Sequence, residues 1–316
     1  MSPLRSIVLA ALATLAFSAA PASAQSRLTI VVPFAPGGGI DIFARLMGEE
    51  IGKSGQSVLI ENRPGASSMI GSAYVARAAP DGATVLLTSN STLIAPTLRA
   101  SDFDPQRDLV PVCNLAESAQ VIVVGASAPY KTLADLVAAA KARPGALTIG
   151  SNGPASTQQF GAEMFKSAAG IDMIYVPYNG GAPAVTALVG GQIEAIVANV
   201  TEVHSQIEAG QLRALATSST KRVASLPDVP TTRESGLDFD VASWHGVALP
   251  AKAPPDVVAR VEKLFMTALA APVLRDKLAG ARYAPTGLCG APVAEFMAAQ
   301  VKSIGEIAAR AGIKLE

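Results

Sequence analysis

The sequence has few of the residues that build catalytic and metal sites. Its 316 residues include two histidines, two cysteines and one tryptophan. His204 falls in an expected helix and His245 follows Trp244 in an expected strand, so we expect both imidazoles at the surface or at an interface. No G-x-S-x-G and no H-E-x-x-H motif occurs, which argues against the common serine hydrolases and zinc peptidases. We predict no catalytic residue and no metal site.

Cysteine is too scarce for a disulfide scaffold. The two cysteines, Cys113 and Cys289, are far apart in the chain. In an oxidising compartment they can form one bridge, but two separate buried thiols are an equally good interpretation, because the sequence does not give the distance between them. Both alternatives stay open at this point.

Charged residues are also scarce, and neither sign dominates. They make up 16% of the chain, with 25 Lys and Arg against 25 Asp and Glu. If residues 1–24 are removed, Arg5 leaves with them and the formal net charge becomes −1. This balance gives no support for a nucleic-acid partner or a lipid-binding surface.

Long hydrophobic runs are absent except near the N-terminus. Arg5 precedes an apolar run over residues 7–17, and the small residues Ala22-Ser23-Ala24 precede Gln25. This order predicts a secretory signal peptide over residues 1–24, a mature chain that starts at Gln25, and a periplasmic location. A membrane anchor is the weaker alternative, because the run is shorter than the roughly 20 residues that a spanning helix needs.

What the sequence does contain is a repeated alternation of strands and helices, which predicts an α/β fold with parallel sheets. Short apolar runs alternate with helical spacing from residue 28 to residue 218. The expected strands are 28–32, 58–62, 84–89, 147–151, 173–178, 193–199, 212–218 and 239–249, with apolar segments at 110–115 and 120–125. The expected helices include 132–143, 183–189, 202–209, 255–269, 273–279 and 293–310.

The pattern restarts near residue 130, which predicts two lobes. We expect residues 25–123 and 245–316 to form lobe 1, and residues 124–244 to form lobe 2. The chain would then cross between them near Val124 and Ser243, and two crossings make a hinge with a ligand cleft between the lobes. Trp244, beside the second crossing, either lines this cleft or packs in a core.

Four uncharged loops follow expected strands, at residues 33–39, 89–92, 151–157 and 177–183. Gly, Ser, Thr and Asn dominate them, and in an open α/β sheet such loops lie where ligands bind. The first loop, PFAPGGG, joins a strand directly to a helix, so free N–H groups and the positive end of the helix dipole point to one place. This arrangement suits a carboxylate.

A nucleotide-binding enzyme is the alternative that these loops leave open. Gly37 and Gly39 match the first two glycines of a Rossmann fingerprint, but Ile42 stands at the third position; Glu61 stands where a ribose-binding acid would be. Export counts against a nicotinamide cofactor. Gly52-Lys53-Ser54 follows a helix rather than a strand, so we interpret it as a helix end.

Motifs along nearly the whole mature chain resemble one family. The segments VVPFAPGGGID, VLIENRPGASSMIG, ARAAPDG, YVPYNGGAPAVTALVGGQIEA, IEAGQLRALA and LPDVPTTRESG are similar to Bug-type extracytoplasmic solute receptors of tripartite tricarboxylate transporters. The resemblance implies a type II periplasmic binding protein without catalytic activity or cofactor. It implies a small organic carboxylate as ligand, integral membrane transporter subunits as partners, and a monomer.

The resemblance also implies that the ligand carboxylate is held between residues 34–41 and 178–183. With the other strand-end loops, the candidate ligand-binding residues are Phe34, Ala35, Pro36, Gly37, Gly38, Gly39, Asp41, Ser89, Ser91, Ser151, Ser156, Thr157, Tyr178, Gly180, Ala182 and Asn199. A receptor that reports ligand occupancy to a signalling partner is a further alternative.

Several positions depart from the family's common pattern. The chain has Tyr175 and Asn179 where the family often reads HVPYKG, Gln159-Phe160 where a His-Leu pair is common, and Ala198 where an acid often precedes Asn199. Each change removes a charge or a titratable group. A ligand with one carboxylate and a neutral or aromatic tail therefore fits as well as a di- or tricarboxylate.

Overall fold

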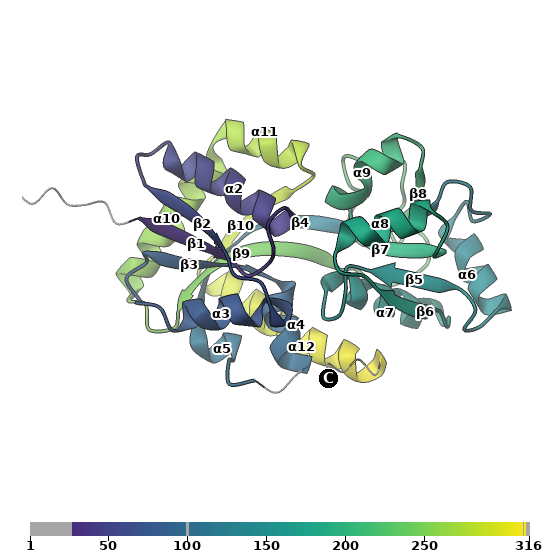
Figure 1. Ribbon diagram of the computed structural model, residues 1–316, viewed down its shortest axis with the longest axis horizontal. Coiled ribbons are helices and arrows are strands. Elements are labelled where there is room, and N and C mark those ends of the chain that lie inside the picture. The colour runs from purple at the N-terminus through teal and green to yellow at the C-terminus, as the bar shows by residue number, and fades with distance from the viewer. Residues whose placement is uncertain (1–26, 99–100, 312, 314–316) are drawn as a thin grey trace, which may run out of the picture.

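The computed structural model describes residues 27–98, 101–311 and 313, and the predicted signal peptide lies outside them. The molecule is elongated, with two α/β halves side by side (Figure 1). Its strands are β1 (Leu28–Val32), β2 (Val58–Asn62), β3 (Thr84–Ser89), β4 (Leu109–Gly125), β5 (Thr148–Ser151), β6 (Ile174–Pro177), β7 (Ala195–Asn199), β8 (Leu212–Thr217), β9 (Ala242–Pro250) and β10 (Ala284–Cys289).

Helices connect these strands. They are α2 (Gly39–Gly52), the short 3-10 helix η1 (Ala66–Ser68), α3 (Met69–Ala76), α4 (Asn90–Leu98), α5 (Pro105–Asp108), α6 (Leu133–Ala142), α7 (Thr157–Ala169), α8 (Gly181–Val189), α9 (Val200–Glu208), α10 (Pro255–Ala270), α11 (Pro272–Gly280) and α12 (Ala291–Ala311).

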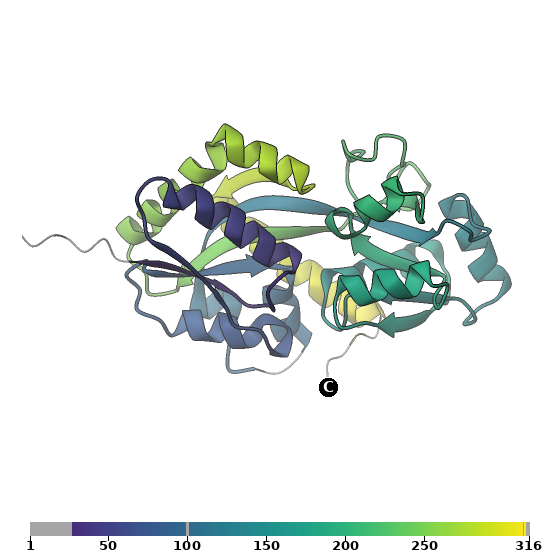
Figure 2. The ribbon, with the colours of Figure 1, turned by 45° about the horizontal axis from the view of Figure 1, so that its top comes forward.

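Within the described residues, the strands form one ten-stranded sheet in the order β2-β1-β3-β9-β4-β7-β5-β6, and β10 and β8 both pair with β4. In the half that holds β1, that strand pairs in parallel with β2 and β3, while β9 is antiparallel to both β3 and β4. In the other half β5 pairs in parallel with β6 and β7. The parallel pairs place the ends of β1 and β3 and the ends of β5 to β7 toward one another, which gathers the predicted loops near the middle of the molecule (Figures 1 and 2).

Strand β4 belongs to both halves. Its residues 109–119 pair with β9, whereas residues 120–124 pair with β7 and residues 121–125 with β8. The sequence predicts two separate apolar segments here, because Glu117 and Ser118 interrupt the apolar pattern. In the structure the polar residues lie within a continuous strand, where ladder hydrogen bonds to neighbours on both sides override the local preference.

Helices cover both faces of the sheet, so both faces of its strands are buried. On one face, Phe43 and Met47 of α2 pack with Ile30 of β1 and with α10 and α11. On the other face, Val31 and Val75 belong to a second cluster. Successive side chains of a strand point to opposite faces, so the continuous apolar run at residues 28–32 indicates a strand that is buried on both sides, as predicted.

Two elements at the margins of the predicted loops differ from expectation. Residues 90–98 form α4, so Ser91 lies in a helix and not in a loop after β3. The sequence favoured a loop because Ser, Asn and Thr prefer turns and helix ends. Strand β10 was not predicted, because Pro285 and Gly287 are unfavourable in strands; it is an antiparallel strand with an irregularity between Pro285 and Leu288.

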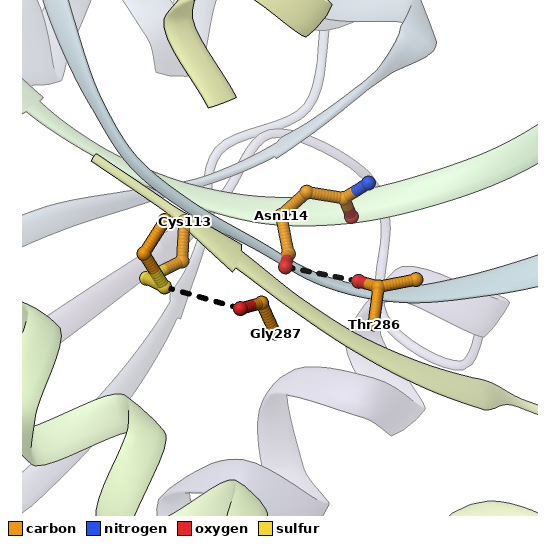
Figure 3. The surroundings of a disulfide bond; sticks show 5 residues. Cys113, Asn114, Thr286 and Gly287 are labelled. Atoms are coloured by element: carbon orange, nitrogen blue, oxygen red, sulfur yellow. Dashed lines mark hydrogen bonds between the residues drawn. A yellow bond between two sulfur atoms is a disulfide. The ribbon is translucent and has the colours of Figure 1, made fainter. Parts of the chain in front are cut away.

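The two cysteines form a disulfide bond that joins β4 to β10. Cys113 and Cys289 are direct partners in this antiparallel pair, and beside them the Thr286 hydroxyl donates a 2.9 Å hydrogen bond to the Asn114 carbonyl oxygen (Figure 3). Of the two alternatives that the sequence leaves open, the bridge is the one observed.

Candidate functional site

The first glycine loop is held in shape by a carboxylate behind it. Asp41 is 2% exposed, and its side chain accepts hydrogen bonds from the Gly37 amide (2.9 Å), from Arg45 (2.8 Å) and from Asn62 Nδ2 (2.8 Å). Burial alone would raise the pKa of Asp41, but these hydrogen bonds together lower it below its usual value. Asp41 therefore stays ionised and orders the loop, and its direct contact with a ligand stays a prediction.

The loop leaves a row of backbone donors free. Among the described residues, no acceptor contacts the N–H groups of Gly38, Gly39 and Ile40 at the start of α2, whereas the amides of Asp41 and Ile42 both reach the Gly38 carbonyl. Residues 35–38 are exposed. Free amides combined with the helix dipole make this end of α2 suitable for an anion. Figures 1 and 2 show it directed toward the half that contains α8 and α9.

On the opposite side, two predicted loops lie against each other. The Tyr178 amide donates to the Ser151 carbonyl and the Gly180 amide donates to the Asn152 carbonyl, both at 3.1 Å. Gly180 has φ of +113° and precedes α8 directly, a backbone conformation that side chains rarely adopt. The loop thus presents the N-terminal end of α8 with little side-chain cover.

The serines of the 151–157 loop form hydrogen bonds within the protein. Ser151 Oγ lies 2.7 Å from the Tyr175 hydroxyl, and burial raises the pKa of Tyr175 to about 12, so it stays neutral. Ser156 Oγ accepts a hydrogen bond from the Gln159 amide as the N-cap of α7 and donates to the Gly153 carbonyl. Both hydroxyls position the loop.

A carboxyl group that the sequence analysis missed lies beside this second loop. Glu202 accepts hydrogen bonds from Asn152 Nδ2 (2.8 Å) and from the Asn199 amide (3.1 Å). A Cβ added at Gly181 would stand 2.9 Å from its carboxyl carbon, and burial raises the pKa of Glu202. An Asn three residues before a Glu at a helix start is a capping-box pattern, so the signal was present in the sequence.

Tyr283 lies beside the start of α2 and within electrostatic range of Glu202. Its hydroxyl oxygen would lie 2.8 Å from a Cβ at Gly39, so that position of α2 has no room for a side chain. Burial raises the pKa of Tyr283, and the charge of Glu202 adds to the effect, which places the two groups within electrostatic range. No motif marks Tyr283, because it precedes the strand β10 that the sequence does not predict.

Both histidines are buried, so the expected surface position is wrong, whereas the expected interface position fits His204. His245 packs against Phe43 and Tyr283 with ring centroids 5.4 Å away, and burial lowers its pKa to about 4. His204 lies at a contact between the two halves, where the Arg282 guanidinium is 3.2 Å from its Nδ1. The sequence lacks the long-range information that would show this burial. Trp244, 1% exposed, packs in a core.

The remaining predicted residues divide between two places. Asn199 Oδ1 accepts a hydrogen bond from Ser243 Oγ (2.7 Å), so Asn199 lies with Tyr178, Gly180 and Ala182 on the α8–α9 side. Ser91 Oγ donates to the Ala155 carbonyl (3.4 Å), where α4 meets α7. Thr157 lines a separate cavity beneath this contact, and buried Ser89 Oγ has no partner among the described atoms.

Comparison with known proteins identifies the family of this chain. Residues 43–313 match the tripartite tricarboxylate transporter family receptors, TctC. The chain belongs to this family. In the described part of the chain, no helix of this TctC protein is long and apolar enough to cross a membrane, and no three His, Cys, Asp or Glu residues are grouped as metal ligands.

Relatives of similar length share both sequence and fold. The protein BugT of Bordetella pertussis is 32% identical over 307 residues, which cover 94% of each chain. The structure of the periplasmic binding protein BugD superimposes with a TM-score of 0.81 at 30% identity, over 92% of this chain and 99% of that one. The structure of R. palustris Rpa4515 with adipate superimposes with a TM-score of 0.83 at 31% identity, over 91% of this chain and 98% of that one. The chain therefore has the α/β periplasmic binding protein fold that the sequence predicts.

Proposed function

We propose that this TctC receptor captures a small organic carboxylate in the periplasm and delivers it to integral membrane transporter subunits, without catalysing a reaction. The amides of Gly38, Gly39 and Ile40, which have no acceptor among the described residues, carry this proposal, together with the direction of the start of α2 toward the half that contains α8 and α9 (Figure 1). The family match and the adipate-bound neighbour support it. We infer further that residues 1–24 are removed on export and that the receptor acts as a monomer.

The ligand carboxylate is bound mainly by main-chain donors in this proposal. One side is supplied by residues 34–39 and the other by Tyr178, Gly180, Ala182 and Asn199. A hydrogen bond to a charged group contributes about 1.5–3 kcal/mol. A few such bonds, less the costs of desolvation and ordering, reach roughly −8 kcal/mol, which corresponds to micromolar affinity.

Binding closes two lobes around the ligand in this proposal. Lobe 1 consists of residues 25–123 and 245–316, and lobe 2 of residues 124–244, with a hinge near Val124 and Ser243. The position of β4 and β9 between the two halves of the sheet supports these boundaries. A carboxylate held at the start of α2 and at the start of α8 would favour the closed form, because it contacts both lobes.

The far end of the ligand is neutral or weakly polar in this proposal. Ala198 and the neutral Tyr175 offer no positive charge to a second carboxylate. Monocarboxylates with an apolar or aromatic tail are thus the first class to test, followed by dicarboxylates.

Titration calorimetry on protein freed of copurifying ligand tests the proposal. The panel contains benzoate, hexanoate, adipate and citrate, and we expect saturable heat with at least one of them. The Gly38→Val variant should lose this binding and keep its thermal unfolding temperature, because a Cβ at Gly38 meets only the Ala35 carbonyl, at 3.9 Å. Gly52→Val, at the other end of α2 with open space around it, is the matched control and should bind normally.

Two outcomes contradict the proposal. If no member of the panel gives heat or raises the unfolding temperature of the wild type, carboxylate capture is wrong. If Gly38→Val binds as tightly as Gly52→Val, the first loop is not the carboxylate site.

A further inference from the structure

A second cavity lies away from the α2–α8 site, beneath the contact between α4 and α7. Its volume is about 240 Å³, and its lining comes from α4, α7 and α12, from Glu117 of β4 and from the two chain segments near residues 218–220 and 240–244. None of the glycine loops at residues 34–39 and 178–182 takes part in it. The cavity is therefore a feature that the proposed carboxylate site does not explain.

Aromatic and sulfur-containing side chains form much of its wall. Trp244 and Phe296 meet edge to face with ring centroids 5.7 Å apart, and Phe160 and Met164 line the cavity from α7. Aromatic faces attract cations through their quadrupole, and the attraction is stronger where water is excluded.

The charged residues of the lining are all acidic. Glu117 and Asp240 line the cavity, and no Lys, Arg or His does so. Glu117 is the direct cross-strand partner of Trp244, so their side chains lie on the same face of the sheet. Its Oε1 accepts a 3.3 Å hydrogen bond from Asn114 Nδ2, and no basic side chain pairs with it among the described residues. Asp240 pairs with Arg233 at 3.1 Å, and Arg233 also pairs with Asp238.

A largely buried acid without a positive partner is unfavourable in its ionised form, which is consistent with the raised pKa of Glu117 that burial causes. A bound cation would supply the missing partner, and the aromatic wall would exclude water around it. The same groups would disfavour an anion.

We propose that this cavity is a second binding site, for a small organic cation: a protonated or quaternary amine with an apolar substituent, whose nitrogen pairs with Glu117. The apolar substituent packs between Phe160, Met164 and Phe296. Because α4 and α7 belong to different halves of the sheet, an occupant contacts both halves. This cation site is distinct from the site proposed for the carboxylate.

Tryptophan fluorescence offers a direct test, because Trp244 is the only tryptophan in the chain and lines the cavity. The probes are butylammonium, butyltrimethylammonium and, as a neutral analogue of similar size, 1-butanol, at constant ionic strength. We expect saturable fluorescence changes with the two cations and at least tenfold weaker binding of butanol.

Glu117→Gln keeps the shape of the side chain and removes the charge, so it should weaken cation binding at least tenfold. Glu295→Gln, at an exposed position of α12 outside the lining, is the matched control and should bind cations as the wild type does. Circular dichroism shows whether each variant is folded. If Glu117→Gln does not fold, Phe296→Leu provides the test, with an expected loss of at least threefold.

The proposal is wrong if butanol binds as tightly as the cations, if no cation saturates the signal, or if the folded Glu117→Gln variant keeps wild-type affinity. Carboxylate titrations of Glu117→Gln by calorimetry separate the two sites, since carboxylate binding should be unchanged in this variant.

Discussion

At the scale of single residues, His245 couples the stability of the fold to pH. It lies between the rings of Phe43 and Tyr283, below the start of α2, and burial lowers its pKa from 6.5 to about 4. The unfolded chain therefore takes up a proton at a higher pH than the folded protein does. Stability that is fully present above pH 6.5 is lost as the pH falls through 4.

We expect His245→Phe to remove this loss, because a phenyl ring fits an aromatic cluster and does not titrate. The shift corresponds to about 3 kcal/mol at most, so between pH 7 and pH 4.5 the wild type should lose roughly 2–3 kcal/mol more than the variant. Urea unfolding at the two pH values measures this difference in the free energy of unfolding. An equal loss in both proteins would contradict this origin of the acid sensitivity.

Asp41 shows how much the sequence predicts about a single residue of the candidate site. The pattern GGGID predicts an acid at the start of a helix, and the structure turns Asp41 inward, onto Gly37, Arg45 and Asn62. A sequence specifies that an acid is present there but not the direction of its side chain. Whether the sixteen candidate residues touch a ligand stays a prediction.

At the scale of elements, the disulfide fixes β10 to β4. It closes a loop with a sequence separation of 176 residues, and the chain-entropy view gives about 4–5 kcal/mol for loops of that order. We expect the double variant Cys113→Ala/Cys289→Ala to be less stable than the oxidised protein by about 3–5 kcal/mol in urea unfolding. Reductant should destabilise the wild type and leave the double variant unchanged; a double variant as stable as the oxidised protein would refute this role.

The elements that the sequence predicted well are those whose information is local. Leu28–Val32, Val58–Asn62 and Thr84–Ser89 are short apolar runs bounded by turns, and each is a strand. Strands β4 and β10 depend instead on partners far away in the chain. Polar residues interrupt the pattern of β4, so the sequence indicates only two separate apolar segments of this strand. Pro285 and Gly287 weaken the pattern of β10, so no local pattern predicts it.

At the scale of the whole molecule, one polar contact joins the two halves on the side of α9 and α11. His204 Nε2–H donates a hydrogen bond to the Ser225 carbonyl at 3.1 Å. The Arg282 guanidinium and the Glu208 carboxylate each lie 3.2 Å from Nδ1. Arg282 adopts φ of +65°, which is uncommon for residues other than glycine.

We expect Arg282→Asn to favour a more open molecule, because asparagine tolerates this backbone conformation but cannot reach His204. Small-angle X-ray scattering of the ligand-free variant should give a larger radius of gyration. Loss of a charged hydrogen bond worth about 1.5–3 kcal/mol should weaken carboxylate binding roughly tenfold. Arg275→Asn, an exposed position on α11, is the control; identical scattering of both variants would contradict this role.

The repeat of the β-α pattern after residue 130 was enough to predict two α/β halves with loops facing each other, since parallel strands impose that geometry. The cavity beneath the contact between α4 and α7 was not predictable in the same way. It depends on how Trp244, Phe160 and Phe296 meet from three distant segments, and helical or strand periodicity contains no such information.

The shared strand β4 has a practical consequence for protein engineering. Because its residues 109–119 pair with β9 and its residues 120–124 pair with β7, neither half is a self-contained module. A chimaera that exchanges one half with a relative must be joined within this strand, and it succeeds only if the donor keeps the pairing of Gln120 with Asn199. Insertions for a fluorescent sensor belong instead at exposed turns such as residues 190–192, where no ladder is interrupted.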